Sequence, residues 1–250
     1  MRLRPWMILV ALLAFVAVLL LRFPLRWALP LLPSQVQCAQ PSGSVWQGRC
    51  GALTVTGPAG AVPLGSVSWD LRIASALRAH AAGLARFEGP QVLGSAQFDA
   101  APGGDLALDA VDVTAPLDHR LLSMVPANWT GRLVLRLPQL SIRDGRLLRA
   151  QGSIEAHDVV AQGPRPDEFG SYALTFDGQP QGGVHRGMLR DLGGPVELSG
   201  TLDVKEDLAF MLDALVKPRA TATPELQRLL EYLGPPDAQG RRRFGAEGTF

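Results

Sequence analysis

The 250-residue sequence has only two cysteines, 6% aromatic residues and 19% charged residues. It lacks a C-x-x-C pair, the H-E-x-x-H pattern of zinc proteases, a G-x-S-x-G nucleophile turn, a P-loop GK[ST] sequence and the dinucleotide-binding G-x-G-x-x-G. These absences leave no known motif for redox, metal, nucleotide or serine-hydrolase chemistry. Hydrophobic residues make up 47% of the chain, too many for a disordered protein. Only one long apolar run is present, which argues against a polytopic membrane protein.

The charges are nearly balanced, with 24 Lys plus Arg, 23 Asp plus Glu and a net charge of +1. Residues 1–37 carry four arginines and no acid, which leaves the rest of the chain with a net charge of −3. A nucleic-acid binder needs a basic surface that neutralises phosphates. The sequence therefore predicts no nucleic-acid partner, and the absent motifs predict no small-molecule substrate.

The amino-terminal segment predicts a membrane anchor. Residues 6–21 (WMILVALLAFVAVLLL) carry no charge, and apolar residues beyond Arg22 extend the run. A cleaved signal peptide would need a small-x-small site after the run, where FPLRWALPLLP stands instead. A lipoprotein signal would place a small residue before a cysteine near the end of the run, but Gln37 precedes Cys38. An uncleaved single-pass helix is the prediction we adopt.

This anchor divides the chain. Arg2 and Arg4 favour a cytoplasmic N-terminus, which places everything after the anchor outside the cytoplasm. The predicted segments are a cytoplasmic tail over 1–5, a transmembrane helix over 6–25, a linker over 26–41 and a β-rich domain over 42–250.

Cys38 and Cys50 lie just beyond the anchor, twelve positions apart. In an oxidising compartment, two cysteines at this spacing favour a disulfide that closes a small loop. The alternative is a pair of unpaired thiols that behave as small apolar side chains.

Beyond the linker, apolar and polar residues alternate with the period of two that is typical of half-buried strands. The alternation is clearest over 67–73, 133–137, 148–157, 172–176, 196–205 and 208–212. It slips by one residue between Leu108 and Val111, which predicts a β-bulge. Asp144-Gly145 predicts a hairpin turn, and Lys205-Glu206-Asp207 predicts another connection. The predicted fold is mainly β, with roughly ten to twelve antiparallel strands forming either a curled sheet or a sandwich.

Two short helices are predicted among the strands. The first covers residues 117–125 (LDHRLLSMV). The second begins after Thr223, a good N-cap, and ends at Gly234-Pro235. Its leucines form one apolar stripe, at positions 226, 229, 230 and 233. The stripe predicts packing against the sheet; docking of a partner helix is the alternative.

The chain offers few candidates for catalysis. Its histidines are far apart in sequence, at His80, His119, His157 and His185. The acidic residues around Gly103-Gly104 lack the spacing and closing Glu of a calcium loop. We therefore assign no catalytic, cofactor-binding or metal-binding residue; an enzyme would have to assemble its site from scattered residues. The run Arg241–Arg243 is either a solvated end or part of a docking edge.

Two stretches of the sequence resemble the type II secretion system protein N family, also called general secretion pathway protein N. SGSVWQGRCGALTV (Ser42–Val55) and PLGSVSWDLR (Pro63–Arg72) match its Gly-x-x-Trp-x-Gly segment and Leu-Gly-x-x-x-Trp strand at Gly43, Trp46, Gly48, Leu64, Gly65 and Trp69. TPELQRLLEYLGPPDAQGRRRFGAEGTF (Thr223–Phe250) is similar to its closing helix, turn and strand, with matches at Leu233, Gly234, Asp237 and Gly240.

The resemblance implies a non-enzymatic accessory component of the type II secretion system, which exports folded proteins from the periplasm. It implies a single-pass protein of the bacterial inner membrane with a periplasmic domain, no cofactor, and partners among the inner-membrane or periplasmic components of the system. Trp46, Trp69 and Trp129 are candidate aromatic anchors for an interface. The alternation also places Trp69 with Val67 and Leu71 on the buried face.

A lipid-binding or lipid-transfer protein is the alternative function. A curled sheet with one apolar face resembles the AsmA-like lipid-transfer proteins, so lipid is a possible partner. In that case the apolar face of the strands is left uncovered, whereas a sandwich buries it. Alternation alone does not distinguish the two arrangements, because the period of two is the same in both.

Overall fold

The computed structural model describes residues 6, 10, 12, 15, 18, 22–31, 34–57, 60–76, 78–120 and 125–249. The predicted tail over 1–5 and most of the predicted anchor over 6–25 lie outside these residues. Among the described residues, no helix is both long enough and apolar enough to cross a membrane. Two short helices precede the sheet, α2 (Leu25–Ala28) and the 3₁₀ helix η1 (Leu29–Leu31).

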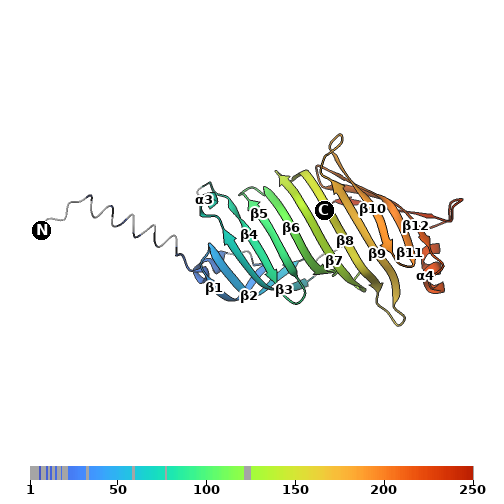
Figure 1. The fold of residues 1–250 in the computed structure, drawn as a ribbon, viewed down its shortest axis with the longest axis horizontal. Coiled ribbons are helices and arrows are strands. Elements are labelled where there is room, and N and C mark those ends of the chain that lie inside the picture. The colour runs from blue at the N-terminus through green and yellow to red at the C-terminus, as the bar shows by residue number, and fades with distance from the viewer. Residues whose placement is uncertain are drawn as a thin grey trace.

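The described residues form one antiparallel sheet of thirteen strands (Figure 1). Every strand pairs with its neighbours in sequence, so the order runs from β1 to β13 without a crossover. The strands are β1 (Val36–Gly43), β2 (Gln47–Gly57), β3 (Gly60–Leu71), β4 (Ala81–Glu88), β5 (Leu93–Ala100), β6 (Leu106–Pro116), β7 (Trp129–Arg143), β8 (Arg146–Ala161), β9 (Asp167–Asp177), β10 (Val184–Gly193), β11 (Val196–Lys205), β12 (Ala209–Pro218) and β13 (Arg242–Thr249).

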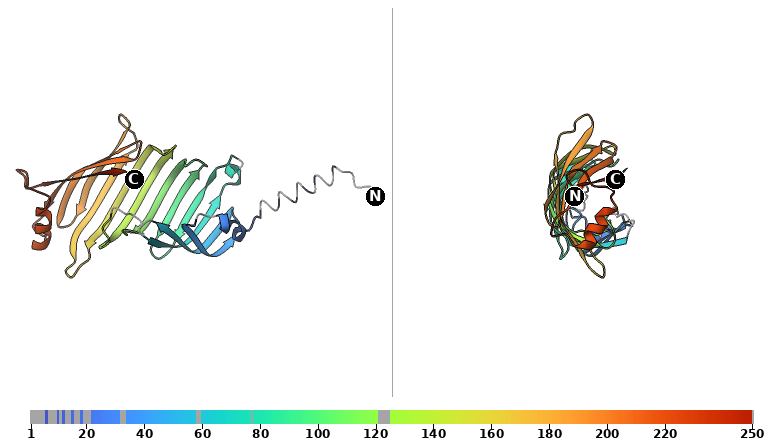
Figure 2. Two further views of the ribbon diagram at one scale, coloured as in Figure 1. Left: turned by 180° about the vertical axis from the view of Figure 1, so that it is seen from behind. Right: turned by 90° about the vertical axis from the view of Figure 1, so that its right-hand side faces the viewer.

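The sheet is curled into an open trough. Seen end-on in Figure 2, it forms a crescent with a concave and a convex side. Two more helices accompany it: α3 (Ile73–Ala76) between β3 and β4, and α4 (Pro224–Glu231) between β12 and β13. In the same view α4 lies on the concave side, near the C-terminal end of the trough. Of the two predicted arrangements, the structure has the curled sheet and not the sandwich.

The strand register explains why the sheet has two distinct faces. Directly paired residues point to the same face, so the pairing can be followed across the sheet in rows. One row crosses all thirteen strands through apolar residues, Gly and Pro only: Pro41, Cys50, Val67, Phe87, Gly94, Val113, Leu135, Ile154, Leu174, Leu189, Gly200, Ala214 and Phe244. We call this the apolar row.

The adjacent row points to the opposite face and is polar except at Gly245 and Met188. It comprises Ser42, Arg49, Ser68, Arg86, Ser95, Asp112, Arg136, Ser153, Thr175, Met188, Thr201, Asp213 and Gly245. The strict alternation in the sequence therefore produces one apolar face and one polar face on a single layer.

Helix α4 identifies the apolar face as the concave one. The Thr223 hydroxyl accepts a hydrogen bond from the Leu226 amide at 3.1 Å and caps the helix. Leu226 is fully buried and, together with Leu230, joins a core cluster with residues of β7–β9, β11 and β12: Leu133, Val159, Phe169, Val196 and Val216. The predicted helix packs on the sheet as expected from its leucine stripe.

Several predicted local features are confirmed. Asp144-Gly145 turns the chain between β7 and β8, and Lys205–Asp207 connects β11 to β12. The slip near Leu108 is a bulge at Ala110, where φ is +48° and the β5–β6 register shifts. The sheet itself begins at Val36, inside the segment 26–41 expected to be a linker, where β1 pairs with β2.

The helix predicted over 117–125 is absent from those of its residues that the structure describes. Residues 121–124 lie outside the described chain, and the described residues 117–120 contain no helix. Asp118 accepts hydrogen bonds from the backbone and the guanidinium of Arg120, at 2.9 and 3.0 Å. This local side-chain bonding favours a turn over a helix at this point.

Candidate interaction surface

The concave face is the most distinctive surface of the described chain. A water-facing sheet of this length would normally show polar residues on any face that is not packed against a second layer. Here α4 covers only the C-terminal end of the concave face, and the apolar row continues from β13 to β1. Two recesses in this face are lined almost wholly by apolar side chains, one at each end of the trough.

The C-terminal recess, of about 420 Å³, lies between α4 and the sheet. Its aromatic wall is built from Trp129 and Phe169, whose ring centroids lie 4.6 Å apart. The other lining residues include Val196, Leu198, Val216, Leu229, Tyr232 and Phe244. Leu229 is 47% exposed, so the recess is open to solvent along the helix.

A small cluster of hydrogen-bonded polar side chains lies beside this recess. The Tyr172 hydroxyl donates a hydrogen bond to the Phe169 carbonyl at 2.6 Å, and burial raises its pKa well above the ordinary value. Arg219 lies 2.7 Å from the Asp191 carboxylate and donates to the Gly194 carbonyl. These contacts satisfy the polar groups without placing an unpaired charge against the recess.

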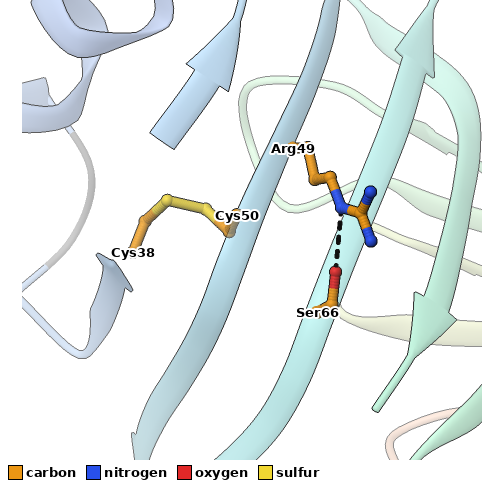
Figure 3. The surroundings of a disulfide bond; sticks show 4 residues. All are labelled: Cys38, Arg49, Cys50 and Ser66. Atoms are coloured by element: carbon orange, nitrogen blue, oxygen red, sulfur yellow. Dashed lines mark hydrogen bonds between the residues drawn. A yellow bond between two sulfur atoms is a disulfide. The ribbon is translucent and has the colours of Figure 1, made fainter. Parts of the chain in front are cut away.

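The N-terminal recess, of about 330 Å³, is lined by α2 and the first strands. Its walls include Leu25, Val36, Cys50, Val67, Trp69 and Phe98. A disulfide joins Cys38 of β1 to Cys50 of β2, with Cα atoms 5.5 Å apart (Figure 3). Beside it, Arg49 points to the other face of β2 and donates a hydrogen bond to the Ser66 hydroxyl at 3.1 Å.

The N-terminal motif residues have structural roles around this recess. Gly48 pairs with Trp69, and a Cβ atom at Gly48 would lie 2.4 Å from the indole ring. The glycine therefore makes room for the tryptophan, whose Nε1 donates to the Val45 carbonyl at 2.9 Å. Gly43 begins the β1–β2 turn that carries Trp46, and the amide of Leu71 donates to the Trp46 carbonyl at 2.6 Å.

The Leu64-Gly65 pair marks a close approach of two backbones. Gly65 has a φ of +82°, and a Cβ atom there would lie 2.5 Å from the Cα of Gly89. A side chain at this position would push β3 away from the β4–β5 turn.

The C-terminal motif residues form the turn between α4 and β13. Leu233 packs against the α4 core cluster, and Gly234 follows it with a φ of +105°. The Asp237 carboxylate accepts hydrogen bonds from the amides of Gln239 and Arg241, both at 2.9 Å, and this lowers its pKa. Gly240 completes the turn with a φ of +78°.

The three arginines of the run 241–243 make separate contacts. Arg241 pairs with Asp237 at 2.9 Å, and Arg242 donates to the Gly234 carbonyl. Arg243 reaches across to Asp213 of β12 at 2.7 Å. The run therefore holds the start of β13 in place rather than forming a free basic patch.

The convex face carries a series of cross-strand ion pairs. They include Arg49 with Glu88, Arg136 with Glu155, Arg186 with Asp203 and Arg243 with Asp213. The guanidinium of Arg186 lowers the pKa of Asp203, and that of Arg243 lowers the pKa of Asp213. The last three pairs join neighbouring strands and favour this register by a small amount per pair, whereas Arg49 of β2 reaches across β3 to Glu88 of β4.

The structure brings no catalytic constellation together within its described residues. Three histidines each lie near one acid: His80 with Asp99, His119 with Asp118 and His157 with Glu155. His185 is buried on the concave side of β10, next to Val204, and its Nε2 lies 3.2 Å from the Leu147 carbonyl. No group of three potential metal ligands occurs in the described part of the chain.

Sequence reasoning missed the C-terminal recess. Trp129 is a candidate anchor from its sequence, but its partners lie on strands far from it in sequence: Phe169 and Tyr172 on β9 and Phe244 on β13. Tyr172 is one residue of an alternating run, and Phe169 and Phe244 lie outside the runs that predict strands, so none of the three gives an individual signal. The pairing of strands and the return of α4 over them create the recess, so only the tertiary structure shows it.

These features define a class of protein: within the described residues, a single open antiparallel sheet with an apolar concave face. A family model described as "Type II secretion system (T2SS), protein N" matches residues 34–245. The chain is also 24% identical over 226 residues to "Type II secretion system protein N" from Vibrio cholerae serotype O1 (strain ATCC 39315 / El Tor Inaba N16961), covering 88% of this chain and 87% of that protein. No solved structure matches the chain.

The chain therefore belongs to the type II secretion system protein N family, and the resemblance seen in the sequence is confirmed. Its membership implies an accessory role in type II secretion.

Proposed function

We propose that this protein is a non-enzymatic accessory component of the type II secretion system, anchored in the inner membrane with its sheet in the periplasm. The observation that carries the proposal is the family match over residues 34–245, which includes the whole trough except the end of β13. The uncharged run over 6–21 and the disulfide Cys38–Cys50 support the membrane location and an oxidising compartment. In this role the protein takes part in the export of folded proteins, with other inner-membrane or periplasmic components of the system as partners.

The fold suits a scaffold. A long sheet anchored at one end presents a concave face, a convex face and a free edge to neighbouring domains. Strand addition at such an edge, or insertion of a side chain into an apolar recess, gives an interface without a cofactor. The recesses beside Trp69 and Trp129 are the places where a partner side chain would be buried.

A gene deletion tests the proposal directly. The enzymes that the host bacterium exports are measured in the periplasm and in the culture medium, in the deletion strain and in strains supplied with the full-length chain or with a chain ending at Gly194. The full-length chain is expected to reverse a periplasmic accumulation, and the shortened chain, which lacks β11–β13 and α4, is not. Immunoblots establish that both chains are present in the membrane. Unchanged secretion in the deletion strain would contradict the proposal.

One observation favours lipid binding as a second function. The apolar row runs uninterrupted along the concave face, and no second sheet covers it in the described chain. The N-terminal recess includes Leu25 and Ala28 of α2; Leu25 is the last residue of the predicted membrane segment and Ala28 lies three residues beyond it. An acyl chain of a membrane lipid would meet apolar side chains from β2 to β13, and its transfer from water is favourable by about 0.8 kcal/mol per buried CH₂.

A fluorescent fatty acid tests this second function. Energy transfer from tryptophan to the probe reports binding to the purified full-length chain, and Leu229→Glu places a charge in the C-terminal recess. Binding is expected to weaken at least tenfold. Met188→Glu makes the same charge change on the convex face, at a residue that is 58% exposed, and serves as the control. Equal binding by both variants, or no binding by the unaltered chain, would rule out the recess as an acyl-chain site.

A further inference from the structure

The two edges of the sheet differ in how well they are protected. An unpaired edge strand offers a row of free N–H and C=O groups to another strand. At the β1 edge, Pro41 has no N–H to donate, and Gln40 has a φ of +53°. The chain before β1 also passes close to its end, where Pro24 bridges to Ser44 and the amide of Val45 donates to the Phe23 carbonyl at 3.0 Å.

The β13 edge has none of these features in the described chain. Eight consecutive residues, Arg242 to Thr249, pair with β12 without a register shift. The strand contains no proline, and all its residues except Arg242 are exposed. β13 is the last strand in the order, so its outer side is unpaired within the described residues.

We propose that β13 pairs antiparallel with β13 of a second copy of this chain, about a two-fold axis at Gly245. A two-fold interface brings each residue of the patch against its symmetry mate, so the patch must be complementary to itself. Centred on Gly245, this register places Arg243 of each copy opposite Glu247 of the other. The edge sequence RRFGAEGT thus gives two identical Arg–Glu cross-strand pairs.

The apolar face agrees with the same register. Phe244 of one copy lies opposite Ala246 of the other, and these residues pair with Ala214 and Leu212 of β12 within their own chain. The two concave faces then open on the same side, and the apolar row continues from one copy into the next. A shift by one residue would place the apolar face of one copy beside the polar face of the other. A shift of the axis by one residue towards the C-terminus, to Ala246, would put Glu247 opposite Gly245 and lose both ion pairs.

Arg243 remains available to a second carboxylate. It already contacts Asp213 at 2.7 and 2.9 Å, but its side chain is 77% exposed. A guanidinium has five N–H donors and binds two carboxylates without losing either contact. Within the described chain no ion pair is found for Glu247, which lies at the exposed edge.

Cysteine cross-linking of the full chain in its own membrane tests the register. In Gly245→Cys the two introduced thiols face each other across the axis, with Cα atoms about 5 Å apart, which a disulfide spans. The existing cysteines are already joined to each other. In the control Thr249→Cys the two thiols lie eight residues out of register, about 27 Å apart, and do not react. A reductant-sensitive dimer is expected for the first variant only.

A charge exchange tests the chemistry of the edge. Glu247→Arg places an arginine opposite Arg243 in both cross-strand pairs, and Arg243→Glu places a glutamate opposite Glu247 in both. Each variant alone is expected to dimerise at least about tenfold more weakly, and an equal mixture of the two is expected to form a heterodimer, because every cross-strand pair is again opposite in charge. Glu88→Arg makes the same charge change at an exposed ion pair far from β13 and leaves dimerisation unchanged. Circular dichroism checks that the loss of the Asp213 contact in Arg243→Glu leaves the sheet intact.

Three results would overturn the proposal. These are no Gly245→Cys dimer, equal cross-linking by Thr249→Cys, or a Gly245→Cys cross-link to a different protein. Failure of the charge variants to associate when mixed, with the sheet intact, would refute the Arg–Glu register. None of these results depends on the role in secretion.

Discussion

The different burial of two leucines on helix α4 predicts different losses of unfolding free energy when each is replaced. Leu226 and Leu229 are one turn apart on the same helix, but Leu226 is fully buried against the sheet and Leu229 is 47% exposed. Leu226→Ala removes side-chain atoms from the centre of the C-terminal core cluster and leaves a cavity, which typically costs about 3 kcal/mol of unfolding free energy. Leu229→Ala removes the same atoms from a half-exposed site and is expected to cost less than about 1 kcal/mol.

The two variants share the same helix, the same substitution and the same gain in helix propensity. The difference between their unfolding free energies therefore reports the effect of burial alone. Urea denaturation followed by tryptophan fluorescence measures it, because Trp129 stacks on Phe169 in the affected cluster. Hydrogen exchange of β11–β13 locates the loss of stability. Equal costs at the two positions, or a larger cost at Leu229, would refute the packing of α4 through Leu226. An eight-residue helix has little stability of its own, so loss of this contact is also expected to release α4 as a whole.

Further predictions concern caps, cross-links and pH. Thr223→Ala removes the α4 N-cap and is expected to cost about 1 kcal/mol in the same urea titration, whereas Thr221→Ala, outside the helix, costs little. Replacing Cys38 and Cys50 together by alanine removes a cross-link of separation 12, worth up to about 3 kcal/mol, and is expected to raise hydrogen exchange in β1 and β2 and leave β11 and β12 unchanged. The Arg120 guanidinium lowers the pKa of Asp118 to about 2, so this carboxylate stabilises the fold above about pH 4 and the stabilisation is lost as the pH falls towards 2. The difference in melting temperature between the unaltered chain and Asp118→Asn is expected to shrink over that interval; a difference that does not change with pH would contradict the assignment.

Much of the local structure follows from the sequence because it depends on neighbouring residues. A period of two forces side chains to alternate between faces, so the strands over 196–205 and 208–212 were predictable with their faces. Asp144-Gly145 adopts the positive φ angles that a tight hairpin needs. Thr223, Pro224 and the following leucines specify a capped amphipathic helix. The exception is residues 117–120, where hydrogen bonding by the Asp118 side chain outweighs a helix-like pattern.

The candidate surface was less predictable. The motif residues Gly48 and Trp69 were identified from the sequence, but the reason for their pairing, an indole packed where a Cβ would clash, depends on the β2–β3 register. The difference between the two edges of the sheet was also not predictable without the strand order. Pro41 and Glu247 affect the pairing of an edge only because β1 and β13 are the outermost strands.

The sequence alone determined that this protein is β-rich, that its strands have one apolar and one polar face, and that it belongs to the type II secretion system protein N family. Only the tertiary structure decided that the strands form one open curled layer instead of a sandwich. The physical reason is that alternation fixes the face on which each side chain lies, while the partner that covers the face depends on contacts between distant strands. The same contacts place α4 over one end of the trough and α2 beside the other, and make β13 the last strand of the sheet within the described residues.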